Sequence, residues 1–132
     1  MPAFFEYAEA DGVLRMTLAG ELKDDNLREV RSRASVVSAS FPGCKAIVDL
    51  SNVSSYGVSS TEIAMLAQSP PAQPSIASWV IVAPTDAIYG MSRMFQMLAD
   101  RTRPNLHIVH TMDEAYALLG VKSPQFVPIS PE

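Results

Sequence analysis

One stretch of the chain, residues 44–66, constrains the fold most, because it joins a buried strand to a polar segment and then to a helix start. Its first part, Ala-Ile-Val-Asp-Leu at 46–50, is short and β-branched, which predicts a strand buried on both faces. The serines, tyrosine and glycine that follow predict a polar loop over 51–60. In open α/β sheets ligands bind outside the carboxyl ends of the strands, so we expect a working site at this loop.

A helix starts directly after the loop, with the pattern Ser-x-x-Glu at Ser59 and Glu62. This pattern predicts a capping box, in which the Ser59 hydroxyl accepts from the N–H of Glu62 and the Glu62 carboxylate accepts from the N–H of Ser59. The helix is expected over about 60–68. It ends at a proline-rich segment, because proline cannot continue the hydrogen-bond ladder.

The rest of the chain alternates between strand and helix periodicity. An Asp-Gly pair between alternating runs predicts a β-hairpin over 3–19, with Gly20 ending its second strand. The order β-β-α-β-α-β-α-β-α predicts an α/β fold with a mixed sheet of about five strands and about four helices, in which right-handed crossovers join parallel strands. The remaining helices are expected near 24–41, 86–101 and 111–120, and the remaining strands at 76–83 and 105–110.

We expect one domain at 1–121, followed by a proline-rich tail at 122–132, since a chain of 132 residues suffices for one core and not for two. The tail should be extended. It is either loose or lies along the body of the domain through Phe126, Val127 and Ile129.

The composition argues against several classes of function. The formal charge is −4 and the ten basic residues form no dense cluster, so affinity for nucleic-acid phosphates is not expected. No signal peptide or apolar stretch of membrane-spanning length is evident, which predicts a cytoplasmic protein without stable membrane insertion. Cys44 is the only cysteine and is expected to be a buried apolar filler.

No cofactor, metal or enzymatic activity is expected. His107 and His110 point to opposite faces of a predicted strand and so cannot chelate one ion directly. The glycine motifs that bind phosphates are missing, and so is Gly-x-Ser-x-Gly. An esterase or phosphotransfer enzyme, the third possibility, would need a base near Ser54, Ser55 or Ser59, and none is evident.

Ser59 and Ser60 are possible phosphoacceptors, since a phosphoryl group at a helix N-terminus meets free N–H groups and the positive end of the helix dipole. The simpler interpretation is that Ser59 only caps the helix. Asp49 also has a simple interpretation: it is a polar strand end that accepts hydrogen bonds from nearby amides.

The predicted helix at 86–101 has an apolar face that should be core, formed by Ile88, Met91, Met94, Phe95 and Leu98. Met97 falls outside that face, close to Gly90, Arg93 and Arg101. A methionine between basic side chains suits a surface for a protein partner or a homodimer. The alternative is an ordinary exposed methionine.

Several segments carry a resemblance to a known family: Ile-Val-Asp-Leu-Ser-Asn-Val at 47–53, Ser-Ser-Thr-Glu-Ile at 59–63, Ala-Pro-Thr-Asp at 83–86, Tyr-Gly-Met-Ser-Arg-Met at 89–94 and the run from Asp113 to Gly120. With the element order, they resemble the STAS domain of bacterial anti-sigma factor antagonists, and more specifically its SpoIIAA-like branch, over nearly the whole chain except the tail. The resemblance implies a regulatory module that binds a protein, such as an anti-sigma-type kinase or another regulator. Phosphorylated antagonists carry Asp-Ser-Ser-Gly here, whereas this chain has Gly-Val-Ser-Ser-Thr at 57–61.

Two functions stay open. The first is regulatory protein–protein interaction, through the loop after the central strand and the flank of the helix from Asp86. The second is a carrier for a small amphipathic molecule or lipid in the crevice lined by Asn52, Tyr56, Thr85 and Tyr89, which requires a pocket of a few hundred Å³. The candidate binding residues are Asp49, Ser51, Asn52, Ser54, Ser55, Tyr56, Thr85, Asp86, Tyr89, Gly90, Arg93 and Met97.

Overall fold

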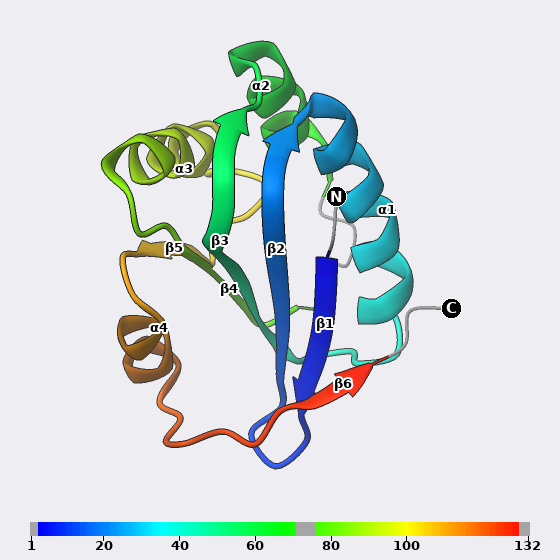
Figure 1. Ribbon diagram of the computed structural model, residues 1–132. Helices are drawn as coiled ribbons and strands as arrows, with labels where there is room; N and C mark the ends of the chain where they lie inside the picture. Colours follow the sequence, from blue (N-terminus) through cyan, green and yellow to red (C-terminus); the bar gives the residue numbers. More distant parts are fainter. Residues whose placement is uncertain (1–2, 71–75, 130–132) are drawn as a thin grey trace.

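The structure, a computed structural model, describes residues 3–70 and 76–129. Figure 1 shows a twisted sheet with helices packed against it. In the described residues the sheet has six strands in the order β5-β4-β3-β2-β1-β6. The elements are β1 (Ala3–Ala8), β2 (Val13–Lys23), α1 (Asp24–Ser38), β3 (Lys45–Gly57), α2 (Ser60–Gln68), β4 (Ser78–Val82), α3 (Asp86–Leu98), β5 (Leu106–Val109), α4 (Met112–Leu119) and β6 (Val127–Ile129).

The sheet is mixed, as the sequence predicts. β1 and β2 form an antiparallel hairpin around Gly12, which has a φ of +65° that glycine adopts without strain. β2, β3, β4 and β5 are parallel neighbours. The α/β fold with an N-terminal hairpin and βαβ units is therefore confirmed.

The helices divide between the two faces of the sheet. Because successive side chains of a strand point to opposite faces, Ala46 belongs to the core cluster that includes residues of α1, α2 and α3, whereas the neighbouring Ile47 belongs to the cluster that includes Ala115 and Leu119 of α4. α4 contacts β3, β4 and β5 on its face. Figure 1 shows α1 at the right edge and α3 at the left edge of the sheet, and α2 at the end where β2 and β3 point.

The expected loop at 51–60 is wrong. β3 continues to Gly57 and pairs in parallel with β2, which itself passes Gly20 and continues to Lys23. The extended pairing has two irregularities of register, and Gly20 has a φ of +87° beside one of them. A run of exposed serines resembles a loop, but here one neighbouring strand satisfies its backbone while the side chains face solvent.

The end of the chain adds a strand that the sequence order did not include. Val127–Ile129 pairs antiparallel with Phe5–Tyr7 of β1, so this part of the expected tail lies along the body as an edge strand. Phe126, just before it, packs on the guanidinium of Arg15 at 3.9 Å. Arg15 also pairs with Glu6 at 2.8 Å, and this cluster covers β1 and β2 on the face where α4 lies.

The inner face of α3 differs from the predicted one. Phe95 and Ile88 are buried as expected, but Leu98 is 48 % exposed and ends the helix. Ser92 and, just beyond the helix, Ala99 are buried instead. The buried positions Ile88, Ser92, Phe95 and Ala99 follow one another at spacings of three or four residues, and Leu98 lies beside this stripe.

No helix among the described residues has both the length and the apolar character needed to cross a membrane. Cys44 is buried as predicted, and burial raises the pKa of its thiol.

Replacing a core residue on the α4 face should cost far more than replacing Leu98. Ile47 is completely buried, so Ile47→Ala removes its packing and leaves a cavity, at a cost of about 2–5 kcal/mol in the free energy of unfolding. Leu98→Ala, at an exposed position, should change it by less than about 0.5 kcal/mol. Urea unfolding of both variants tests the assignment, and equal losses would contradict it.

Candidate functional site

A cavity of about 180 Å³ lies between the sheet and the three helices on one face. Its floor consists of side chains from β2 to β5, such as Leu18, Val48 and Trp79. α1 and α3 supply the sides. Ile63 and Leu66 of α2 also line it, so α2 acts as its roof. The remaining lining residues are Met16, Leu22, Leu27, Val30, Arg31, Ala34, Leu50, Tyr56, Val58, Ile81, Met91, Ser92, Phe95, Arg103 and Leu106.

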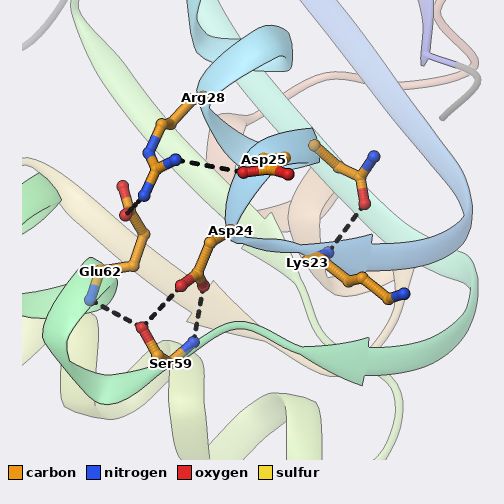
Figure 2. A network of polar contacts seen from close by, with 7 residues as sticks. Lys23, Asp24, Asp25, Arg28, Ser59 and Glu62 are labelled. Carbon is orange, nitrogen blue, oxygen red and sulfur yellow. Dashed lines mark hydrogen bonds and ion pairs between the residues drawn. The ribbon is translucent and has the colours of Figure 1, made fainter.

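The start of the roof is tied to α1 by Ser59. The Ser59 hydroxyl accepts from the N–H of Glu62 at 3.1 Å, which is the expected helix cap. The second half of the predicted capping box is wrong, because the N–H of Ser59 donates to Asp24 Oδ1 and the hydroxyl donates to Asp24 Oδ2, both at 2.8 Å. Figure 2 shows Ser59 between Asp24 and Glu62.

The Glu62 carboxylate turns instead to α1. Arg28 donates to Glu62 at 2.7 Å and to Asp25 at 3.2 Å, so one guanidinium joins α2 to the first turn of α1 (Figure 2). Glu62 is nearly buried, and its ion pair with Arg28 offsets the free-energy cost of burying the carboxylate. A competing cation from another helix cannot be read from a local Ser-x-x-Glu pattern, which is why the capping box was predicted in full.

The hydrogen bonds from Ser59 lower the pKa of the Asp24 carboxyl, first through the backbone N–H and then through the hydroxyl, with Arg28 adding to the effect. A carboxyl with a lowered folded-state pKa stabilises the fold above its unfolded-state pKa. This contribution is lost as the pH falls through the folded-state value. The connection between α1 and α2 therefore holds at neutral pH and weakens only in acid.

The end of the roof is held by arginines from both sides. Arg31 of α1 donates to the carbonyl of Pro70 at 3.0 Å. Arg103, beyond α3, donates through Nη1 to the carbonyls of Leu66 and Ser69 at 3.2 and 3.1 Å. Leu66 lies in the last turn of α2, and Ser69 and Pro70 follow the helix, so these contacts hold the segment at the end of α2.

Only one of the four residues expected to line a ligand crevice lines the cavity. Tyr56 does so from the last part of β3, where burial and then the charge of Asp24 raise the pKa of its phenol to about 12. Asn52, Thr85 and Tyr89 do not line it, so the predicted crevice and this cavity share only Tyr56. Thr85 caps α3 by accepting from Ile88, and Tyr89 stacks on His110 with ring centroids 4.0 Å apart.

The other polar residues, which were predicted in the loop after the central strand, lie on β3 and are exposed. Ser51, Asn52, Ser54 and Ser55 face solvent. Asp49 Oδ1 accepts from the N–H of Ser51 at 2.9 Å, as predicted, but Asp49 lies within β3 and not at the end of the strand. The pairing of β3 with β4 ends at Asp49, so among the described residues the rest of β3 has a strand neighbour only on the β2 side.

The residues predicted as a docking face gather on the outer side of α3. Met97 is 72 % exposed, and Gly90, Arg93 and Asp86 are exposed as well. Arg93 donates to Gln96 at 2.9 Å on the same helix. Met97 and Leu98 together place two large apolar side chains at the solvent-facing end of α3.

The predicted phosphoacceptors differ in their surroundings. The Ser59 hydroxyl is in direct contact with the Asp24 carboxylate, so a phosphoryl group on Ser59 would meet a like charge. Ser60 is exposed in the first turn of α2.

Sequence reasoning missed Arg31 and Arg103 as site residues. Neither arginine belongs to a recognised motif, so the sequence alone assigned no role to either of them. The available signal was strand alternation, which places Met16 and Leu18 on the same face as Val48. This alternation does not show that α1 and α3 leave an unfilled space above these three side chains.

No group of histidine, cysteine or acidic side chains in the described ranges could hold a metal ion. Comparison of the sequence with known protein families finds no match, and comparison with curated proteins also finds none.

Removing the Ser59 hydroxyl should loosen the roof. Ser59→Ala deletes the cap of α2 and one hydrogen bond to Asp24, so we expect a loss of about 1 kcal/mol in the free energy of unfolding, measured with urea. Ser60→Ala is the matched control, since it changes an adjacent exposed serine. A loss no larger than that of the control would show that the contacts of Ser59 contribute little.

Proposed function

We propose that this protein is a non-enzymatic binding module that holds a small apolar molecule in the cavity under α2. The observation that supports this most strongly is the lining. Apart from Arg31, Tyr56, Ser92 and Arg103, the side chains are aliphatic, aromatic or methionine, as in ligand pockets generally.

The size of the cavity limits the ligand. At about 180 Å³ it falls short of the few hundred Å³ expected for a carrier of lipid-sized molecules. It is slightly larger than an engineered apolar cavity of about 150 Å³ that binds benzene. The proposed ligand is therefore a body of benzene size, or a chain of about six carbons.

Trp79 provides a direct measurement of occupancy. It is the only tryptophan of the chain and it lines the cavity, so its fluorescence should change when a neutral probe such as 1-hexanol enters. Ala34→Leu adds a larger side chain to the lining from α1 and should abolish the change. Absence of any fluorescence change in the unaltered protein, up to the solubility limit of the probe, would contradict the proposed function.

Val36→Leu is the control for this variant. Val36 lies on the same helix, is 60 % exposed and does not line the cavity. It should leave probe binding unchanged. Urea unfolding of both variants separates a filled cavity from a damaged fold.

The second candidate function is regulatory docking to a protein, and we propose it on two observations. β3 beyond Asp49 presents a strand edge that another chain could extend, within the residues described. Met97 and Leu98 expose apolar surface on α3. The hairpin followed by βαβ units also supports our proposal that the chain is a STAS-type domain of the SpoIIAA-like branch. The proposed partner is an anti-sigma-type kinase or another regulator. The simplest partner is a second copy of the chain, which would form a homodimer.

Self-association tests the α3 surface. If copies of the chain associate through it, Arg93→Glu and Met97→Asp should each shift the sedimentation coefficient toward the monomer, because each places a negative charge at the contact. Lys122→Glu makes the same charge change at an exposed position beyond α4, outside the proposed surface, and should have no effect. Unchanged sedimentation in both test variants would exclude α3 as the contact between copies.

A further inference from the structure

We propose that the ligand of this cavity carries a single carboxylate, which Arg31 and Arg103 bind, while its apolar body fills the space above the sheet. This inference rests on the proposed function and adds the chemical class of the ligand.

The first support is the placement of charge. Arg31 and Arg103 line the cavity and are partly exposed, so their side chains reach from the apolar lining to solvent. In the described ranges neither forms an ion pair with a carboxylate, whereas Arg15 and Arg28 each do. The two basic groups therefore give one end of an otherwise apolar cavity a positive charge.

The second support is mutual repulsion. Burial and then the charge of Arg31 lower the pKa of the Arg103 guanidinium. A bound anion would offset both the desolvation of the Arg103 guanidinium and its repulsion by Arg31, because it carries a negative charge and accepts hydrogen bonds in place of water.

The third support is the number of hydrogen-bond donors. A guanidinium carries five N–H groups. Arg103 uses Nη1 for the carbonyls of Leu66 and Ser69 and for Thr102, and Arg31 uses Nη2 for Pro70. The remaining nitrogens can form the two parallel hydrogen bonds that a carboxylate accepts from arginine.

The same contacts explain why the arginines are held in place without the ligand. They bind the carbonyls at the end of α2, which carries the negative end of the helix dipole. If the two arginines only hold the end of α2, the protein should bind a charged and a neutral ligand equally well. The two roles therefore make different predictions.

The test compares pairs of ligands that differ in the head group only. Hexanoate and 1-hexanol represent an aliphatic body, and benzoate and benzyl alcohol represent an aromatic one. In titrations followed by Trp79 fluorescence at pH 7, the carboxylate of the pair that fits should bind on the order of tenfold more tightly than its alcohol. The pair with the larger difference in affinity between acid and alcohol shows whether the apolar part of the ligand is aliphatic or aromatic.

Arg31→Gln should weaken binding of that carboxylate on the order of tenfold and leave binding of the alcohol unchanged. Arg101→Gln, an exposed arginine outside the lining, is the control and should change neither. The ligand comparison on the unaltered protein requires no variant, so it decides the question even if Arg31→Gln fails to fold.

Equal binding of acid and alcohol by the unaltered protein in both pairs would overturn the carboxylate inference and leave the proposed function standing. Binding of neither member of either pair would overturn the proposed function itself.

Discussion

The spacing of α1 and α3 above the sheet is the constraint on which the site depends. α1 packs on β2 and α3 packs on β5, three strand positions apart. At about 4.8 Å per strand this is roughly 14 Å, whereas helices in direct contact pack about 8–10 Å apart. The gap is too wide for the two helices to close and too narrow for a third helix to lie on the sheet between them. α2 therefore lies above the gap, and a cavity is left beneath it.

This position explains why so many polar contacts gather on α2. The helix has nine residues, of which Glu62, Ile63 and Ala67 are buried, so apolar packing alone fixes it weakly. Hydrogen bonds and ion pairs at both ends supply the rest, from Asp24 and Arg28 at the start and from arginines at the other end. An element held in this way opens at lower cost than a strand inside the sheet.

The elements with strong local signals were predictable from the sequence. The Thr111–Glu114 capping box and Gly120 at the end of α4 are found as predicted, because both depend on neighbouring residues only. The second half of β3 was not predictable in the same way. Its side chains are exposed, and its partner, the end of β2, lies more than thirty residues earlier. A strand whose side chains face solvent can have the same polar sequence as a loop.

The site was harder to predict than the fold because a cavity has no pattern of its own. Leu18, Val48 and Trp79 have the alternation of ordinary core residues, and that alternation is the same whether or not a helix fills the space above them. Likewise, Arg31 lies at a position that suits a solvated helix side, and only the tertiary structure places it near Arg103. Side-chain periodicity determines which face is buried. The distance between two covering helices is set by the strands that lie between their contact points.

An empty space of this size has an energetic consequence that bears on its role. Unfilled cavity volume costs about 24 cal/mol per Å³, so 180 Å³ corresponds to at most about 4 kcal/mol, less where the space is open to solvent. Domains of this kind are stable by about 5–15 kcal/mol in total. Larger side chains at Ala34 or Ser92, which both line the cavity, would recover part of that loss. Small residues at those positions leave room in the cavity, and the apolar ligand that we propose would return the missing contacts.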